Sequence, residues 1–362
     1  MKLPPAIARW LSPDTRYREL PGSFRLESGE SVDDPVVAYR TWGTLNRDGT
    51  NAVLVCHALT GSADADDWWA GMFGPGRALD PERDFIVCSN VLGGCYGTSG
   101  PLSPAPDGAR RQGGDFPRVT VRDMVHLQRR LLDALGVGRL ALVIGPSLGG
   151  MQVLEWAACY PERVGAIAPI GISARHSAWC IGISEAQRQA IWRDPLWRDG
   201  RYPDDAPPRQ GMSVARMIAM VSYRSWENFE SRFGREQAKP ELFQVESYLR
   251  YQGDKLVDRF DAASYVRLTQ AMDSHDLGRA RGELEAVLAA IRQPALVVSV
   301  SSDVLYPPRE QRYLAEHLPN ARYEELDTPH GHDGFLIDLD ELGEMVRAFR
   351  RGLDAPRAVA AG

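Results

Sequence analysis

The chain has 362 residues, too many for one minimal domain, so either one large domain with an insertion or two domains is expected. Hydrophobic residues make up 44% of it and charged residues 25%, an ordinary globular balance that argues against a disordered or collagen-like chain. A formal net charge of −6 gives no overall attraction for polyphosphate, which disfavours a general nucleic-acid-binding function.

Cysteine usage and hydropathy predict a cytoplasmic protein. The five cysteines form no Cys-x-x-Cys pair, and Cys56 and Cys88 lie inside apolar runs, as buried thiols in a reducing compartment do. Residues 1–20 contain no apolar core of signal-peptide length. No apolar run approaches the roughly 18 residues that a membrane span requires.

In chain order, the sequence predicts a pair of strands and then strands that alternate with helices. Residues 24–26 and 36–39 flank a polar turn at residues 28–34, which is typical of paired strands. Three later apolar runs predict buried parallel strands at residues 52–56, 85–88 and 140–144, and further strands are expected at residues 166–170, 295–300 and around 322–326.

Two helices in this alternating part have clear sequence signals. One begins at a capping box formed by Thr120 and Asp123 and ends at Gly136. Another is expected at about residues 340–350. Strands that alternate with helices predict a mostly parallel sheet covered on both faces, which is an α/β fold.

The region from about residue 174 to residue 291 interrupts this alternation. It contains no convincing buried strand, and strand-like sequence resumes at Ala295, so an insertion between two strands of one sheet is favoured over a separate C-terminal domain. Its helical segments are predicted at residues 184–192, 214–223, 262–272 and 280–291.

The sequence around Ser147 predicts a nucleophile elbow. A buried strand runs directly into Gly145-Pro-Ser147-Leu-Gly149, and helix-compatible sequence follows. The glycines permit a tight turn that lifts the serine hydroxyl above the sheet, and the helix N-terminus favours negative charge beside it. The motif alone is often a plain glycine turn, but in this context it predicts that Ser147 is a catalytic nucleophile.

A nucleophilic serine needs a base that takes its proton and a carboxylate that orients the base, and here the chain order is serine, acid, histidine. Asp303 follows the predicted strand 295–300 and emerges at the same sheet edge as the serine, with a helix cap as its alternative role. After the next strand come His330 and His332, which spacing alone does not separate.

An oxyanion hole needs two backbone N–H donors. Leu148 directly follows the nucleophile and supplies the first. The loop at residues 57–61 is expected to supply the second, and Leu59 is favoured. His57 in this loop is interpreted as a residue near the site rather than as the base. Neither clustered zinc ligands nor a Gly-x-Gly-x-x-Gly turn occurs in the sequence, so no metal site is predicted.

Several motifs spread nearly from end to end of the chain point to one family. They are Tyr39-Arg-Thr-Trp-Gly-Thr-Leu45, Asn51-Ala-Val-Leu-Val-Cys-His-Ala-Leu-Thr-Gly61, Asn90-Val-Leu-Gly-Gly-Cys-Tyr-Gly-Thr-Ser-Gly-Pro101, Gly145-Pro-Ser-Leu-Gly-Gly-Met-Gln152, Ser302-Asp-Val-Leu-Tyr-Pro-Pro308 and Gly331-His-Asp-Gly-Phe-Leu336. In these segments the chain resembles the α/β-hydrolase-fold homoserine O-acetyltransferases of methionine biosynthesis.

The resemblance implies roles for three further residues. The Gly-His-Asp motif points to His332 as the base and implies that Asp333 holds the amino group of an amino-acid acceptor. An arginine of the insertion is implied to pair with the acceptor carboxylate, and the matching segment places it at Arg216. A planar bidentate donor is a physically suitable partner for a carboxylate.

The combined interpretation is an α/β-hydrolase core at residues 1–173 and 293–351, a helical lid at residues 174–292 and a flexible tail at residues 352–362. The expected reaction is ping-pong transfer of an acetyl group from acetyl-CoA to L-homoserine, without a permanently bound cofactor. The expected partners are an amino acid and acyl-CoA, not nucleic acid or membrane, and the resemblance implies a homodimer.

Departures from the common family pattern leave other substrates open. Pro146, Leu148, Tyr96 and Ser99 each differ from the residue that is frequent or usual in the family. Serine or homoserine O-succinyltransfer is therefore the alternative, with hydrolysis less favoured and a silent binding module a further rival. A succinyl carboxylate would need another cation, for which Arg175 and Arg188 are candidates.

Overall fold

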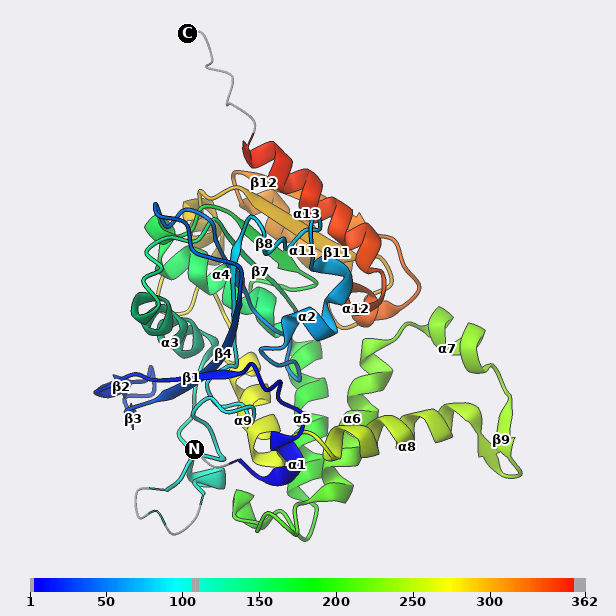
Figure 1. Cartoon of the computed structure of the whole chain (residues 1–362). Coiled ribbons are helices and arrows are strands. Elements are labelled where there is room, and N and C mark those ends of the chain that lie inside the picture. The colour runs from blue at the N-terminus through cyan, green and yellow to red at the C-terminus, as the bar shows by residue number, and fades with distance from the viewer. Residues whose placement is uncertain (1–2, 106–107, 109–110, 355–362) are drawn as a thin grey trace, which may run out of the picture.

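A computed structural model describes residues 3–105, 108 and 111–354, and an eight-stranded sheet forms its centre (Figure 1). The strand order is β1-β4-β6-β5-β7-β8-β11-β12; β4 is antiparallel to both of its neighbours, and the pairs from β6 to β12 are parallel. These strands are β1 (Arg16–Glu19), β4 (Val36–Trp42), β5 (Ala52–Val55), β6 (Phe85–Ser89), β7 (Leu142–Pro146), β8 (Ile167–Ile170), β11 (Ala295–Val300) and β12 (Ala321–Leu326). The predicted α/β class is confirmed.

All six strands expected in this part are present and have parallel neighbours, although β12 is only partly buried, and β11 has the predicted bounds. The N-terminal prediction is incomplete. β2 (Ser23–Arg25) pairs with β3 (Ser31–Asp33) in a separate two-stranded sheet, so the predicted polar turn at residues 28–34 contains a strand. β1 was also not predicted, because its four residues are exposed and carry no apolar alternation.

The sheet is covered on both faces because alternate residues of each buried strand point to opposite sides. Leu54 of β5 belongs to the apolar cluster that includes α3 and α4, whereas Val53 and Val55 belong to the cluster that includes α2 and α13. Thr120 and Asp123 form the predicted capping box at the start of α3. The helices outside the insertion are α1 (Pro5–Ala8), α2 (Ala65–Trp68), α3 (Val121–Ala134), α4 (Leu148–Cys159), α11 (Pro308–His317), α12 (Gly334–Ile337) and α13 (Leu339–Asp354).

The chain between β8 and β11 is mainly helical, as expected. It contains α5 (Ala178–Trp192), α6 (Arg209–Tyr223), α7 (Trp226–Phe233), α8 (Gln244–Val257), α9 (Ala262–Asp273) and α10 (Leu284–Ala290). The sequence did not predict α7, α8 or the short hairpin of β9 (Gln237–Lys239) and β10 (Leu242–Phe243). In Figure 1 these unpredicted elements and α6 project to one side of the sheet.

Two expected boundaries differ from the structure. The helix predicted at residues 280–291 begins only at Leu284, because Ala280 and Gly282 adopt positive φ values in the preceding loop. α10 contacts α11 beside the sheet, which places the end of the expected lid segment against the core. At the other boundary, α13 continues to Asp354, so the expected tail begins inside a helix, and residues 355–362 lie outside the described part.

Candidate active site

Ser147 occupies a strained turn between β7 and α4. Its φ of 54° and ψ of −126° are unusual for a residue with a side chain. The turn is possible because Gly145 and Gly149 lie against the end of β5, where a Cβ at either residue would overlap the carbonyl oxygen of Cys56. Ser147 is 6% exposed and stands at the N-terminus of α4, where the helix dipole favours a developing negative charge.

Gly149→Ala is expected to destabilise the elbow by about 1–3 kcal/mol, because the new Cβ must displace the backbone at Cys56. Gly182→Ala in α5 is the matched control, since open space surrounds that glycine, and it should stabilise the helix by about 0.5–1 kcal/mol. Urea unfolding of the two variants measures the difference. An unchanged free energy of unfolding in Gly149→Ala would contradict the tight contact.

The structure brings Asp303 and His332 together. Asp303 follows β11, and its Oδ2 accepts a hydrogen bond from His332 Nδ1 at 2.6 Å. The second carboxylate oxygen accepts the backbone N–H groups of Leu305 at 2.8 Å and Tyr306 at 2.9 Å. Asp303 is therefore fixed, and the imidazole leaves Nε2 available, which has no hydrogen-bond partner among the residues described.

The two candidate histidines are distinguished by these contacts. His330 Nδ1 lies 2.9 Å from the side-chain nitrogen of Asn228, whereas His332 is the one that contacts the acid. His332 also lies beside the turn that holds the nucleophile. The Ser147 N–H donates to Ile170 at the end of β8, and a Cβ on the next residue, Gly171, would lie 3.5 Å from His332 Cε1.

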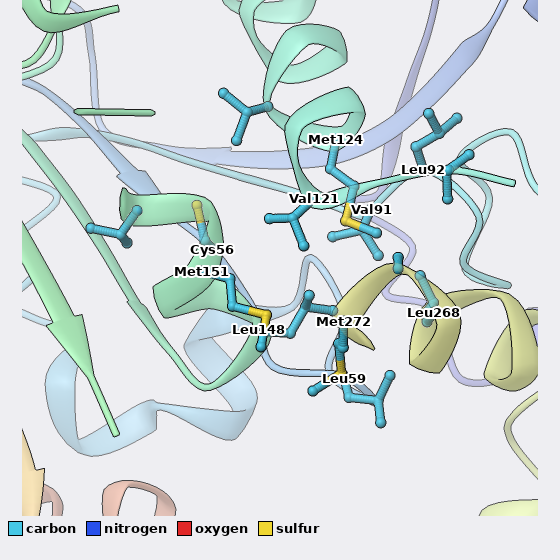
Figure 2. Packing of buried hydrophobic residues seen from close by; sticks show 14 of the residues in the cluster. Cys56, Leu59, Val91, Leu92, Val121, Met124, Leu148, Met151, Leu268 and Met272 are labelled. Atoms are coloured by element: carbon cyan, nitrogen blue, oxygen red, sulfur yellow. The ribbon is translucent and has the colours of Figure 1, made fainter. Parts of the chain in front are cut away.

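Leu59 and Leu148, the expected oxyanion residues, have their N–H groups available. Leu148 begins α4, so its N–H has no acceptor within the helix, and the Leu59 N–H donates to no backbone acceptor in the described chain. Their side chains belong to one buried cluster with Met272 of α9 (Figure 2). Their role in an oxyanion hole stays a prediction.

His57 holds the loop that carries Leu59. Its Nδ1 lies 2.8 Å from the carbonyl oxygen of Ala58, and its Nε2 accepts the Val91 N–H at 3.3 Å, so the pattern requires a neutral ring with the proton on Nδ1. Burial lowers the pKa of His57 to about 4, which favours the neutral form. A hydrogen bond of 2.9 Å from the Gly61 N–H to Ala58 closes the turn.

Three buried histidines are expected to make folding sensitive to acid. Burial lowers the pKa of His57 and His275 to about 4 and that of His176 to about 3. Between these values and the ordinary pKa of about 6.5, the unfolded chain binds more protons, so stability falls as the pH falls through this range. At about pH 5 each of these histidines should lower the free energy of unfolding by on the order of 2 kcal/mol relative to neutral pH.

The measurement is urea unfolding of the protein and of His275→Leu at about pH 7 and about pH 5. The variant cannot take up the extra proton at this position, so its free energy of unfolding should fall less than that of the unaltered protein. Equal losses in the two proteins would show that His275 does not contribute.

Asp333 and Arg216 lie near His332, with two residues that the sequence did not single out. Arg224 Nε forms an ion pair with Asp333 Oδ2 at 3.2 Å, and the Arg216 guanidinium lies 5.3 Å from the centre of the Tyr223 ring. Burial raises the pKa of Asp333, although both arginines act in the opposite direction. Tyr223 lies two helical turns beyond Arg216 in α6, so the two side chains share one face of the helix. This spacing is the one feature of the sequence that could have pointed to Tyr223.

Arg216 is half-buried and forms no ion pair with any carboxylate that the structure describes, and its buried Nε has no hydrogen-bond partner there. An unpaired guanidinium close to a carboxylate offers complementary charges to the two ends of an α-amino acid. Arg175 and Arg188, in contrast, are already paired, with Asp276 at 2.8 Å and with Asp273 at 2.6 Å.

Two other kinds of site receive no support within the described ranges. No group of three or more His, Cys, Asp or Glu side chains there could hold a metal ion. No helix among those residues has the length and apolar character needed to cross a membrane. All five cysteines are free, and Cys56 and Cys88 are buried as expected.

The α/β-hydrolase-fold family model matches residues 51–338. A homoserine O-acetyltransferase from Chlorobaculum tepidum is 57% identical over 343 residues, which cover 95% of this chain and 96% of that relative. The crystal structure of homoserine O-acetyltransferase from Staphylococcus aureus has a TM-score of 0.77 and 28% identity, covering 92% of this chain and 94% of that one. The crystal structure of esterase E22 has a TM-score of 0.86 and 26% identity, and the match covers 93% of this chain and 99% of the esterase. The chain therefore belongs to the homoserine O-acetyltransferase family of α/β-hydrolase-fold acyltransferases.

Proposed function

We propose that the protein transfers an acetyl group from acetyl-CoA to the hydroxyl of L-homoserine through an acyl-enzyme on Ser147. The observation that carries the proposal is the unpaired Arg216 beside Asp333, because an amino-acid acceptor needs a partner for its carboxylate and an esterase substrate does not. The full-length similarity to homoserine O-acetyltransferases supports the choice of acceptor.

In the first half-reaction, His332 Nε2 takes the Ser147 proton while the serine oxygen attacks the thioester carbonyl. The negative charge on the carbonyl oxygen is stabilised by the N–H groups of Leu59 and Leu148. Asp303 keeps the His332 proton on Nδ1 and stabilises the imidazolium. His332 then returns its proton to the sulfur, and CoA leaves.

In the second half-reaction, the acceptor hydroxyl attacks the acyl group on Ser147. Arg216 binds the carboxylate of the acceptor and Asp333 its ammonium group, so the hydroxyl is placed above the ester at a high effective concentration. His332 takes the hydroxyl proton and passes it to the Ser147 oxygen as that oxygen leaves. Donor and acceptor thus react in turn at one serine, which is a ping-pong sequence.

Arg216→Met is expected to raise the KM for homoserine by about a hundredfold, since a charged hydrogen-bonding partner of the carboxylate is lost. The first half-reaction should stay within about twofold of its original rate, because acetyl-CoA does not use this arginine. Steady-state kinetics and single-turnover CoA release measure the two effects. Arg209→Met, which removes an exposed ion pair on the same helix, is the control. Equal slowing of both half-reactions would contradict the assignment.

Acetyl is favoured over succinyl as the transferred group. The two cations considered for a succinyl carboxylate, Arg175 and Arg188, already have carboxylate partners. Binding a succinyl group through either of them would require an existing ion pair to break. Serine or homoserine O-succinyltransfer is the alternative, and a panel of acyl donors and acceptors tests it.

Hydrolysis is the second candidate, because esterase E22 has the same fold over nearly the whole chain. The decisive experiment combines acetyl-CoA or succinyl-CoA with homoserine or serine and follows CoA release and product mass. The proposal predicts the fastest release with acetyl-CoA and homoserine, together with O-acetylhomoserine. If no combination exceeds the rate without acceptor, the transferase proposal is wrong and hydrolysis is favoured.

We also propose that the protein acts as a cytoplasmic homodimer in methionine biosynthesis, without a permanently bound cofactor. The five free cysteines suit a reducing compartment. The exposed side chains of Val221, Trp226 and Tyr251 give the projecting helices an apolar surface that suits a second copy. Light scattering should then give twice the chain mass of 40.1 kDa.

A further inference from the structure

Arg259 connects the inserted segment to the loop that carries Leu59. Its Nη1 donates to the carbonyl oxygen of Thr60 at 2.7 Å and to the Tyr96 hydroxyl oxygen at 2.8 Å, and its Nη2 contacts Thr60 Oγ1 at 3.4 Å. Arg259 lies between α8 and α9, whereas Thr60 and Tyr96 follow strands β5 and β6 of the sheet. Arg259 of the insertion therefore forms hydrogen bonds with Thr60, the residue that follows the expected oxyanion donor Leu59.

The charge of Arg259 is directed at this loop. No carboxylate forms an ion pair with Arg259 in the parts of the chain that the structure covers, and its hydrogen-bond acceptors there are the neutral oxygens of Thr60 and Tyr96. Hydrogen bonds from a charged donor are stronger than neutral ones. The guanidinium thus holds the loop through charge-assisted hydrogen bonds.

The residues after Arg259 fix its position. The Phe260 ring lies edge-on to the Tyr96 ring, with centroids 5.5 Å apart. Asp261 caps α9 by accepting the Ser264 N–H at 2.8 Å, and its other oxygen accepts the Tyr202 hydroxyl at 2.8 Å. Arg259 is thus attached to the start of a well-anchored helix rather than to a free loop.

The helix α9 also covers the expected oxyanion residues. Its Leu268 and Met272 belong to the same buried cluster as Leu59 and Leu148, and Figure 2 shows Met272 beside both of them. The loop at residues 57–61 is therefore held by His57 from the sheet side and by Arg259 and α9 from the insertion.

We propose that Arg259 is a positioning residue for the oxyanion hole. By holding Thr60 through its carbonyl and hydroxyl oxygens, it fixes the loop so that the N–H of the preceding residue, Leu59, points toward the acyl carbonyl on Ser147, and the hole is complete only when the insertion is docked on this loop. The inference rests on the proposed acyl-Ser147 chemistry, but it does not depend on which alcohol receives the acyl group.

The test compares the full-length protein with Arg259→Met, Arg259→Lys and Arg209→Met, using two acyl donors. Acetyl-CoA with homoserine reports the whole reaction, and p-nitrophenyl acetate acylates the serine without any CoA. Arg259→Met should lower kcat with both donors by about tenfold or more and leave both KM values nearly unchanged, because the hole stabilises the transition state of either donor. Arg259→Lys should recover part of the loss, and Arg209→Met should behave like the original protein.

A kcat within about twofold of the original value for both donors would overturn the inference. A loss confined to the KM for acetyl-CoA would also overturn it, since that pattern marks a CoA-binding residue. Tyr96→Phe keeps the ring contact with Phe260 and removes only the hydroxyl acceptor, so it should lower kcat to a smaller extent. If Arg259→Met does not fold, unchanged kcat in both Arg259→Lys and Tyr96→Phe overturns the inference.

The outcomes also separate this inference from the proposed function. If the original protein does not transfer acetyl to homoserine, but Arg259→Met slows the cleavage of p-nitrophenyl acetate, only the proposed function fails. If transfer occurs and the variant has unchanged kcat, only the inference fails. An original protein that cleaves neither donor contradicts both.

Discussion

Replacing Ser147 with alanine is expected to abolish acyl transfer. The substitution removes the oxygen that carries the acyl group, so kcat should fall by a factor on the order of 10⁴ to 10⁶. The free energy of unfolding should change little, because Gly145 and Gly149, whose missing side chains make the strained turn possible, are unaltered in this variant. Stopped-flow CoA release and mass spectrometry of the quenched protein measure the loss.

Ser173→Ala is the matched control for that variant. Ser173 is buried and follows β8, near the site, but its hydroxyl donates to the carbonyl oxygen of Arg175 at 2.6 Å and contacts no part of the proposed triad. An acyl adduct that persists in Ser147→Ala would show that the nucleophile is another residue. Equal loss of the adduct in Ser173→Ala would contradict the assignment, because the loss would not be specific to Ser147.

Asp303→Asn has the second largest expected effect. An asparagine can still accept the N–H groups of Leu305 and Tyr306, so the loop should keep its shape. The amide cannot stabilise an imidazolium, and if its NH₂ faces Nδ1 it selects the wrong tautomer of His332. A fall in kcat of about 10³- to 10⁴-fold is therefore expected.

The measurement is kcat with acetyl-CoA and homoserine, and Asp327→Asn is the control. Asp327 is an exposed residue after β12 whose carboxylate accepts the Ser301 hydroxyl at 3.1 Å. Its substitution should leave kcat nearly unchanged. A loss below about tenfold in Asp303→Asn would mean that the hydrogen bond to His332 does not assist catalysis.

Much of the site could be predicted because its signals are local. The elbow at Ser147 needs only a buried strand, two glycines and a helix in direct succession, and β11 and Asp303 follow one another in the same way. The capping box of α3 likewise lies within four residues, Thr120 to Asp123. In each case the contact that matters joins residues close together in the chain.

The contacts that the sequence did not reveal join distant residues. Arg224 meets Asp333 and Arg259 meets Thr60 only because the insertion folds back over the sheet edge. Nothing in either arginine's own neighbourhood distinguishes it from a solvated one. Spacing left the choice between His330 and His332 open for the same reason, because it depends on which ring reaches Asp303, and only the family resemblance pointed to His332.

The missed helices have a different cause. Most residues of α8 are neither fully buried nor fully exposed, so no narrow apolar stripe marks the helix. β1 is exposed along its length and is held by backbone hydrogen bonds to β4. Such backbone pairing leaves no pattern of apolar residues in the sequence. Prediction from periodicity therefore succeeded in the buried sheet and failed where elements lie at the surface.

The central claim is that an acyl group on Ser147 passes to an amino-acid hydroxyl rather than to water. The direct measurement loads the protein with acetyl-CoA, removes the free donor and follows the acetyl adduct by mass spectrometry with and without homoserine. We expect a stable adduct on the peptide containing Ser147 that homoserine discharges rapidly as O-acetylhomoserine. An adduct that disappears equally fast in water alone, yielding only acetate, would contradict it.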